Sequence, residues 1–128
     1  DLRVAWLLEP IRSKRVHKYS GTNKHPNHQD LLGQTMSAFA HFSCFWSKGT
    51  MVFADLQSTT TATIKGGSLA PAIEHVLFDP MTHTLSQDSG IGDHGRQGIL
   101  DFLQQHTCQD MCKSLALDKV SITLADEE

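Results

Sequence analysis

One stretch of the chain, residues 29–46, has apolar residues at every third or fourth position. These residues are Leu32, Met36, Phe39, Phe42 and Trp46. Because an α-helix turns once in about 3.6 residues, this spacing puts all of them on one face. The pattern therefore predicts an amphipathic helix over this stretch.

Two shorter helices are predicted nearer the C-terminus. Within "GRQGILDFLQQH", Ile99, Phe102 and Leu103 have helical spacing, so we expect a helix that ends near His106. A further short helix is expected over residues 108–117. The acidic residues 124–128 are expected to form a frayed tail.

Four apolar runs have the length and the flanking residues of β-strands. They cover residues 2–8, 16–19, 50–57 and 74–80. The first and last runs are stopped by Glu-Pro and Asp-Pro, and proline cannot donate a hydrogen bond to a neighbouring strand. Residues 58–73, "STTTATIKGGSLAPAI", are rich in Thr, Gly and Ser and are predicted to form an exposed connection. The mixed order of strands and helices predicts a single α+β domain over residues 1–128.

Charge and composition exclude several classes of function. The formal net charge of -3 and the pI near 6.2 offer no broad basic face, so neither nucleic acid nor a membrane is an expected partner. No apolar run is long enough to span a bilayer, and the N-terminus lacks the layout of a signal peptide. Three cysteines are too few for a disulfide framework, which favours a reducing compartment and a cytoplasmic location. Because the chain starts abruptly on an apolar run, we expect it to be cut from something longer.

The segment "HTCQDMC" brings three metal-binding residue types together. A helix over this segment would put Cys108 and Cys112 on one face, with His106 just before it. A tetrahedral zinc site needs a fourth ligand, and the spacing leaves His41 and Cys44 as equal candidates. Such a site would be structural, since four protein ligands leave no open position for catalysis. The alternative is that the cysteines are ordinary core thiols.

Two aspartates follow apolar strands and invite one explanation. Asp55 ends "MVFAD" and Asp79 ends "HVLFD". A buried carboxylate is costly unless it is paired or binds a cation, and magnesium with a nucleotide is the simplest partner. Gln57 would face the same side as Asp55 and could add a neutral oxygen ligand. The alternatives are an acid at a strand exit and a turn that starts at Asp-Pro.

The glycines of "GIGDHG" match the pattern GxGxxG. Gly90, Gly92 and Gly95 lack the preceding apolar strand and the later acidic residue of a dinucleotide-binding fold, so we reject that interpretation. What remains is a loop that leads into a helix and offers backbone amides to an anion or a peptide. A plain turn is the alternative.

Taken together, these segments resemble a known family. "AFAHF", "VFADLQ", "LFDPMTHT", "GDHGRQGILDFLQQH" and "HTCQDMC" occur in this order and resemble the C-terminal lobe of the alpha-kinases, most closely the alpha-kinase-like proteins of fungi. These are atypical serine/threonine protein kinases. The resemblance implies a protein-kinase-like C-terminal lobe with short antiparallel strands and helices around a structural zinc. It also implies a partner that this chain lacks, an N-terminal lobe whose lysine binds the nucleotide phosphates.

The resemblance assigns the metal ligands. It implies a zinc ion held by His41, His106, Cys108 and Cys112. It further implies that Asp79 and Gln57 lie at the magnesium ion.

It also assigns the catalytic and substrate positions. Asp55 is implied at the phosphoryl-transfer step, and Glu9 beside the adenine of ATP. Gly92, Gly95 and Gly98 match a loop that helps to position the substrate peptide.

The implied function is Mg-ATP-dependent phosphoryl transfer to Ser or Thr of a protein substrate. An alternative is a catalytically inactive kinase-like module that binds zinc, which Ser58, the altered loop and the missing N-terminal lobe favour. The chain departs from the family at several places. Ser58 stands where the family has glycine, and Phe78 replaces the usual threonine before Asp79. The connection over residues 58–73 is also longer than the family's. A zinc-containing interaction domain unrelated to kinases is a third hypothesis.

Overall fold

A computed structural model describes residues 3–64, 66–67 and 70–120 of the 128-residue chain. The elements in these residues are β1 (Val16–Lys18), α1 (Leu31–Trp46), β2 (Met51–Ala54), β3 (Gln57–Thr63), β4 (Ala72–Leu77), β5 (Met81–Thr84), α2 (Gly95–Gln105) and α3 (Asp110–Ser114). The predicted α+β class is confirmed. None of the helices in this part of the chain has the length and apolar character needed to cross a membrane.

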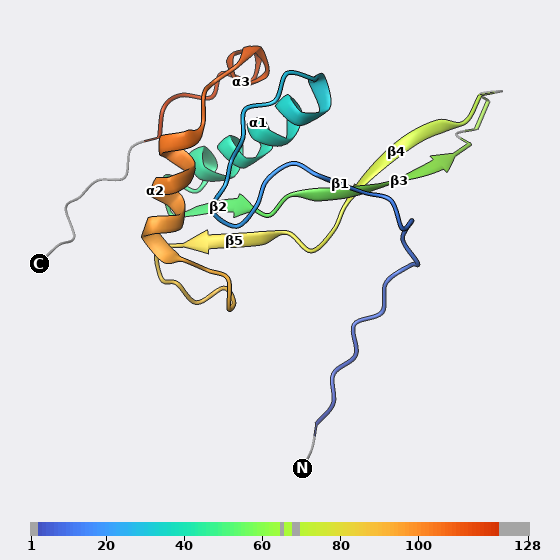
Figure 1. Ribbon diagram of the computed structural model, residues 1–128, viewed down its shortest axis with the longest axis horizontal. Helices are drawn as coiled ribbons and strands as arrows, with labels where there is room; N and C mark the ends of the chain where they lie inside the picture. Colours follow the sequence, from blue (N-terminus) through green and yellow to red (C-terminus); the bar gives the residue numbers. More distant parts are fainter. Residues whose placement is uncertain (1–2, 65, 68–69, 121–128) are drawn as a thin grey trace, which may run out of the picture.

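The strands form two small antiparallel sheets. One has the order β1-β3-β4, and the other pairs β2 with β5, so that Ala54 lies opposite Met81. Figure 1 shows the helices gathered around the β2–β5 pair, while the β3–β4 hairpin projects away from them. The point where β2 passes into β3 therefore joins the helical body to the hairpin.

Helix α1 packs on β2 and supplies three residues of the buried core. Asp30 caps the helix by accepting a hydrogen bond from the backbone N–H of Gly33. The Ser43 hydroxyl donates to the carbonyl of Ala40 and accepts from the backbone N–H of Phe53, which ties α1 to β2. The buried core combines residues of five segments: Tyr19, Met36, Ala40, Cys44, Val52, Leu56, Ile99 and Phe102.

Helix α2 lies against β5 at unusually short range. A Cβ atom added to Gly98 would be 2.2 Å from Cγ of the fully buried His83. No side chain fits in that space, so glycine at this position sets how closely the helix can approach the strand. The His83 ring is fixed there, because Nε2 donates to the carbonyl of Thr22 and Nδ1 accepts from the backbone N–H of His94.

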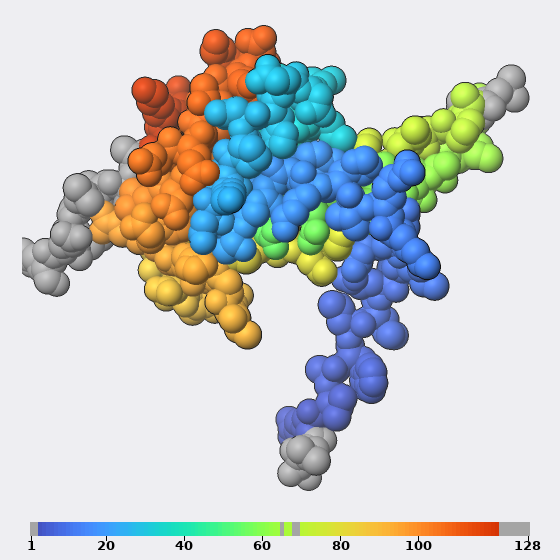
Figure 2. Space-filling model, in the orientation of Figure 1, coloured from blue at the N-terminus to red at the C-terminus, as the bar shows by residue number. Residues whose placement is uncertain are grey.

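Three predicted elements differ from the structure. Residues 3–13 form no strand but an exposed arm that leaves the body (Figures 1 and 2), because the sheets of the described residues give this run no partner. Residues 58–63 and 72–73 of the predicted connection are instead strand, in β3 and β4, because β-branched threonines favour a paired strand. The last helix covers only Asp110–Ser114, so Cys108 precedes it. Strand β5 was not predicted, and residues 124–128 lie outside the described part.

Candidate active site and metal centre

The residues of "HTCQDMC" meet the long helix in one cluster. The donor atoms of His41, His106, Cys108 and Cys112 all lie within 4.8 Å of one another. The Sγ of Cys108 is 3.6 Å from Nδ1 of His41 and 3.8 Å from Nε2 of His106, and the Sγ of Cys112 is 3.5 Å from the same Nε2. Bonds of about 2.0–2.3 Å to a tetrahedral zinc ion require separations of this size between the donors. The four residues therefore fit a zinc ion.

The surroundings of the cluster suit a metal as well. His41 presents Nδ1 to the cysteines because its Nε2 bonds to the carbonyl of Asp118 at 2.7 Å, an outer contact that orients a ligand ring. Burial lowers the pKa of His106 to about 4, with His41 and His25 contributing, so this imidazole is neutral near pH 7 as a ligand must be. A pocket of about 430 Å³ lined by His41, His106 and Cys108 gives a metal ion access.

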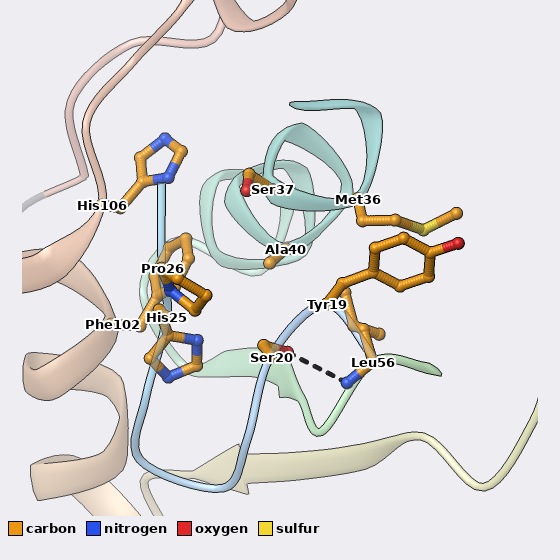
Figure 3. A pocket seen from close by; sticks show the side chains of 10 residues that line it. All are labelled: Tyr19, Ser20, His25, Pro26, Met36, Ser37, Ala40, Leu56, Phe102 and His106. Carbon is orange, nitrogen blue, oxygen red and sulfur yellow. Dashed lines mark hydrogen bonds between the residues drawn. The ribbon is translucent and has the colours of Figure 1, made fainter. Parts of the chain in front are cut away.

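His106 also lies beside the interior of the protein. Its ring stacks on Phe102 and lines a small cavity of about 10 Å³ beneath α1. Figure 3 shows this cavity, where the Ser20 hydroxyl accepts a hydrogen bond from the backbone N–H of Leu56. The cluster is thus built against the core, and its position is fixed by core packing.

Cys44, the other candidate for the fourth ligand, is not in the cluster. It is fully buried among core residues, and burial raises its pKa to about 11. A thiol of this kind is a small apolar core residue and no metal ligand. The geometry selects His41, as the resemblance implies.

The two aspartates lie at the same end of the β2–β5 ladder. Ala54 pairs with Met81, so Asp55 leaves β2 where the Asp79-Pro80 segment enters β5. The backbone carbonyl of Gln57, the first residue of β3, accepts a hydrogen bond from the backbone N–H of Phe78 at 3.3 Å, so Gln57 borders the same place. The structure thus places Asp55, Gln57 and Asp79 around one end of the β2–β5 ladder.

Both aspartates have a left-handed backbone. Asp55 has φ 54° and Asp79 has φ 45°, where residues other than glycine are uncommon. In the described residues, the other non-glycine cases are Lys48 and Ala116, which follow helix ends, and Gln87 in a turn. At a strand end, contacts with neighbouring residues must stabilise such a conformation. For Asp55 one of these contacts is the hydrogen bond from its backbone N–H to the carbonyl of Gly21.

Two cations that the sequence analysis missed accompany the aspartates. Lys18 Nζ forms an ion pair with Oδ1 of Asp55 at 3.0 Å, and this oxygen is buried. Arg12 lies 3.9 Å from Oδ2 of Asp79. The position of Lys18 beside Asp55 follows from the pairing of β1 with β3, in which Lys18 lies opposite Gln57. That register cannot be derived before the Thr-rich segment is known to be a strand.

A pocket of about 520 Å³ lies between the arm and the β3–β4 hairpin. We call it the arm pocket; its walls are residues 9–13, 59–61 and 76–80. Glu9 and Asp79 therefore line the same pocket, although 70 positions separate them in the sequence. Asp55 and Gln57 border the ladder end but do not line this pocket.

Ser58 is accommodated by a hydrogen bond in the core. Its hydroxyl is 2.8 Å from the hydroxyl of Tyr19, and both side chains are buried. The extra hydroxyl that this chain carries at the family's glycine position is therefore satisfied. This departure does not disrupt the site.

The glycine loop is organised by a residue that the sequence analysis missed, Asp93. Its buried carboxylate accepts hydrogen bonds from the backbone N–H and hydroxyl of Thr84, the N–H and hydroxyl of Ser89, and the N–H of Gly95. Burial alone would raise the pKa of Asp93, but these hydrogen bonds outweigh it and hold the pKa well below the usual range. The loop is therefore fixed to the end of β5.

The three predicted loop glycines occupy different places. A Cβ at Gly92 would be 2.6 Å from the sulfur of Met81, so this glycine lets the loop approach the start of β5. Gly95 has φ 64° and begins α2. Gly98 lies inside α2 against His83 and is buried.

Comparison with known proteins identifies the class of this fold. The Alpha-kinase family matches residues 3–112. The chain is 30% identical over 95 residues to alpha-protein kinase vwkA of Dictyostelium discoideum, which covers 73% of this chain and 14% of that protein. It is 29% identical over 85 residues to myosin heavy chain kinase A of the same organism, which covers 66% of this chain and 6% of that protein.

Solved structures agree with the sequence comparison. The crystal structure of the alpha-kinase domain of myosin heavy chain kinase A in complex with ADP matches with a TM-score of 0.64 at 25% identity, over 85% of this chain and 39% of that one. This chain belongs to the Alpha-kinase family. The resemblance seen in the motifs is thus confirmed, and the chain spans well under half of its relatives' length.

Proposed function

We propose that this chain provides the C-terminal lobe of an alpha-type serine/threonine protein kinase, which transfers phosphate from Mg-ATP to a protein substrate. One observation carries the proposal: two aspartates with left-handed backbones lie at one ladder end, next to a pocket that one of them shares with Glu9. The ADP complex of the related myosin heavy chain kinase A domain supports a nucleotide as the pocket's ligand.

Each residue has a part in this proposal. Glu9 would border the adenine, while Asp79 and Gln57 would hold magnesium, which neutralises phosphate charge when bound. Asp55 would act at the phosphoryl-transfer step, where its carboxylate would accept the proton of the substrate hydroxyl. Lys18 places a positive charge beside it, which suits a site where negative charge moves.

A structural zinc ion at His41, His106, Cys108 and Cys112 belongs to the same proposal. It would join α1 to the segment that follows α2. Because the ligands come from both sides of the core, metal binding would stabilise the lobe that carries the aspartates.

An N-terminal lobe that packs against the arm completes the proposal. Five large apolar residues of the arm are strongly exposed: Val4, Trp6, Leu7, Leu8 and Ile11. An apolar surface of this kind is costly in water and is typical of a segment that packs on a partner. We expect the partner lobe to cover the arm and to provide further nucleotide contacts. We also propose a cytoplasmic location, because the three cysteines are unpaired thiols.

A second candidate function, an inactive zinc-binding module, is favoured by one observation. Lys18 lies next to Asp55 and Arg12 lies near Asp79, so that each carboxylate has a cation from the chain itself. Cations in these places would compete with magnesium. A module of this kind would keep its zinc but not transfer phosphate.

Transfer of labelled phosphate from Mg-ATP to a basic Ser/Thr peptide by the zinc-loaded chain tests the proposal. Asp55→Ala should abolish transfer, whereas Asp110→Ala, an exposed carboxylate on α3, should leave it unchanged. Transfer that persists in Asp55→Ala would remove this residue from the mechanism. If the wild-type chain transfers nothing but retains zinc, the inactive module is the better account.

A further inference from the structure

More acidic than basic side chains line the arm pocket. Its lining includes two acidic side chains, Glu9 and Asp79, and one basic side chain, Arg12. A nucleotide brings several negative charges, so two carboxylates alone would repel its phosphates. Magnesium at Asp79 would offset part of this repulsion, and Arg12 is the lining residue that can offset more.

Arg12 is held in place by two neighbours. One end of its guanidinium forms an ion pair with Glu9, three residues before it. Its flat face lies over the ring of Phe78, with the central carbon 4.3 Å from the ring centroid. A guanidinium that stacks on an aromatic face and bonds through one edge loses little further freedom when it binds a ligand.

The remaining edge of Arg12 makes only a long ion pair with Asp79. Its Nη2 is 3.9 Å from Oδ2 of Asp79, too far for a direct hydrogen bond. The Arg12 side chain is 32% exposed, and Asp79 opposite is 65% exposed. The N–H groups on this edge therefore face the same part of the pocket as the expected magnesium ligand, where the phosphates would lie.

We propose that Arg12 binds the phosphate groups of the nucleotide in the arm pocket, and that Phe78 orients Arg12 for this contact. The inference rests on the proposed function, since it names a ligand of the same site. Guanidinium matches phosphate with two parallel N–H bonds, a geometry that lysine does not offer. It also gives Phe78 a role, because the threonine usual in the family would provide no aromatic face for Arg12.

A purely structural role for Arg12 makes a different prediction. If Arg12 only fastened the arm to the hairpin, its loss would weaken every ligand of the pocket alike. If it contacts phosphate, its loss weakens ADP and ATP but spares adenosine. The comparison between nucleotide and nucleoside therefore separates the two roles.

Equilibrium dialysis of the zinc-loaded chain against ATP, ADP and adenosine, each with magnesium, measures this difference. Arg12→Gln should weaken ADP and ATP about tenfold to a hundredfold, the usual effect of losing a hydrogen bond to a charged group. Adenosine affinity should change by less than about threefold, within the scatter of surface substitutions. Arg12→Lys should recover only part of the loss, because it keeps the charge but not the two parallel bonds.

Two further variants complete the experiment. Phe78→Leu should weaken ADP while sparing adenosine, and it should add nothing in the Arg12→Gln background. Arg15→Gln removes a neighbouring exposed arginine that does not line the pocket and should leave all three affinities unchanged.

The outcomes distinguish the two proposals. An equal loss for ADP and adenosine, or no loss in Arg12→Gln, would overturn the phosphate contact while leaving nucleotide binding intact. A wild-type chain that binds none of the three ligands would overturn the proposed function itself, and the role of Arg12 with it.

Discussion

The Sγ of Cys108 lies 3.6 Å from Nδ1 of His41, although 67 positions separate them in the sequence. The contact joins the middle of α1 to the segment between α2 and α3. Closing so long a loop costs chain entropy, which a metal bond offsets far better than a weak contact of a thiol with an imidazole. The cluster thus has the position of a cross-link between the two halves of the lobe.

Replacement of one ligand should therefore remove both metal and stability. We expect Cys112→Ser to lose its zinc and to lower the melting temperature by at least about 10 °C, which corresponds to a loss of about 2 kcal/mol or more. Metal content by mass spectrometry and thermal unfolding check this. Cys44→Ala is the matched control; it should lose some stability from the core but keep one zinc per chain. Equal zinc content and stability in Cys112→Ser and wild type would contradict the cluster's role.

Because α2 lies so close to β5, any side chain added at Gly98 should destabilise the protein. A Cβ there would be 2.2 Å from Cγ of His83, so Gly98→Ala must displace the helix or the buried ring. We expect a loss of about 1–3 kcal/mol in the free energy of unfolding, the usual cost of overpacking. Chemical denaturation gives this value. Gly66→Ala, where the added Cβ meets nothing within 4 Å, should be nearly neutral, and similar losses in both variants would refute the packing argument.

The buried hydroxyls of Tyr19 and Ser58 should behave as a coupled pair. Tyr19→Phe leaves the hydroxyl of Ser58 without its 2.8 Å partner in the core, which should cost about 1–3 kcal/mol. Tyr19→Phe combined with Ser58→Ala should cost less than the sum of the single changes. A double-mutant cycle measured by denaturation tests the coupling, and strictly additive losses would show that the hydrogen bond contributes nothing.

Acid should weaken the anchor of the glycine loop. The pKa of Asp93 is lowered in the folded state, so its hydrogen bonds contribute stability above the unfolded pKa of 3.8 and lose it as pH falls through the lower folded value. We expect the free energy of unfolding to drop more steeply below about pH 4 in wild type than in Asp93→Asn, which has no carboxylate to titrate. Parallel pH profiles for the two proteins would contradict this assignment.

The sequence predicts those parts of the lobe that depend on local pattern. The apolar residues of α1 repeat with helical spacing, so the helix was predicted to begin within two residues of its observed start. The predicted face is buried only in part, because Phe42 is 44% and Trp46 74% exposed. The four donors of the metal cluster followed from residue type and from resemblance to the family. Spacing alone could not choose between His41 and Cys44, because that choice depends on the side from which α1 meets the segment after α2.

Features that depend on long-range pairing were not predictable. The threonines of β3 looked like a polar connection because their side chains are polar and because β1, one of the two partner strands, comes from a distant part of the chain. Arg12 and Lys18 were missed for the same reason, since only the folded arm and the β1–β3 register bring them to the aspartates. The arm itself was taken for a strand because its apolar residues suit one, whereas the described residues offer no neighbouring strand.

Isothermal titration of the zinc-loaded chain with ADP, with and without magnesium, tests the central claim most directly. The account predicts saturable binding of one ADP per chain that is strengthened by magnesium, and loss of that strengthening in Asp79→Asn. It also predicts that Asp110→Asn, with an exposed carboxylate outside the pocket, binds as wild type does. Absence of saturable ADP binding, or binding that neither magnesium nor Asp79→Asn alters, would contradict the account.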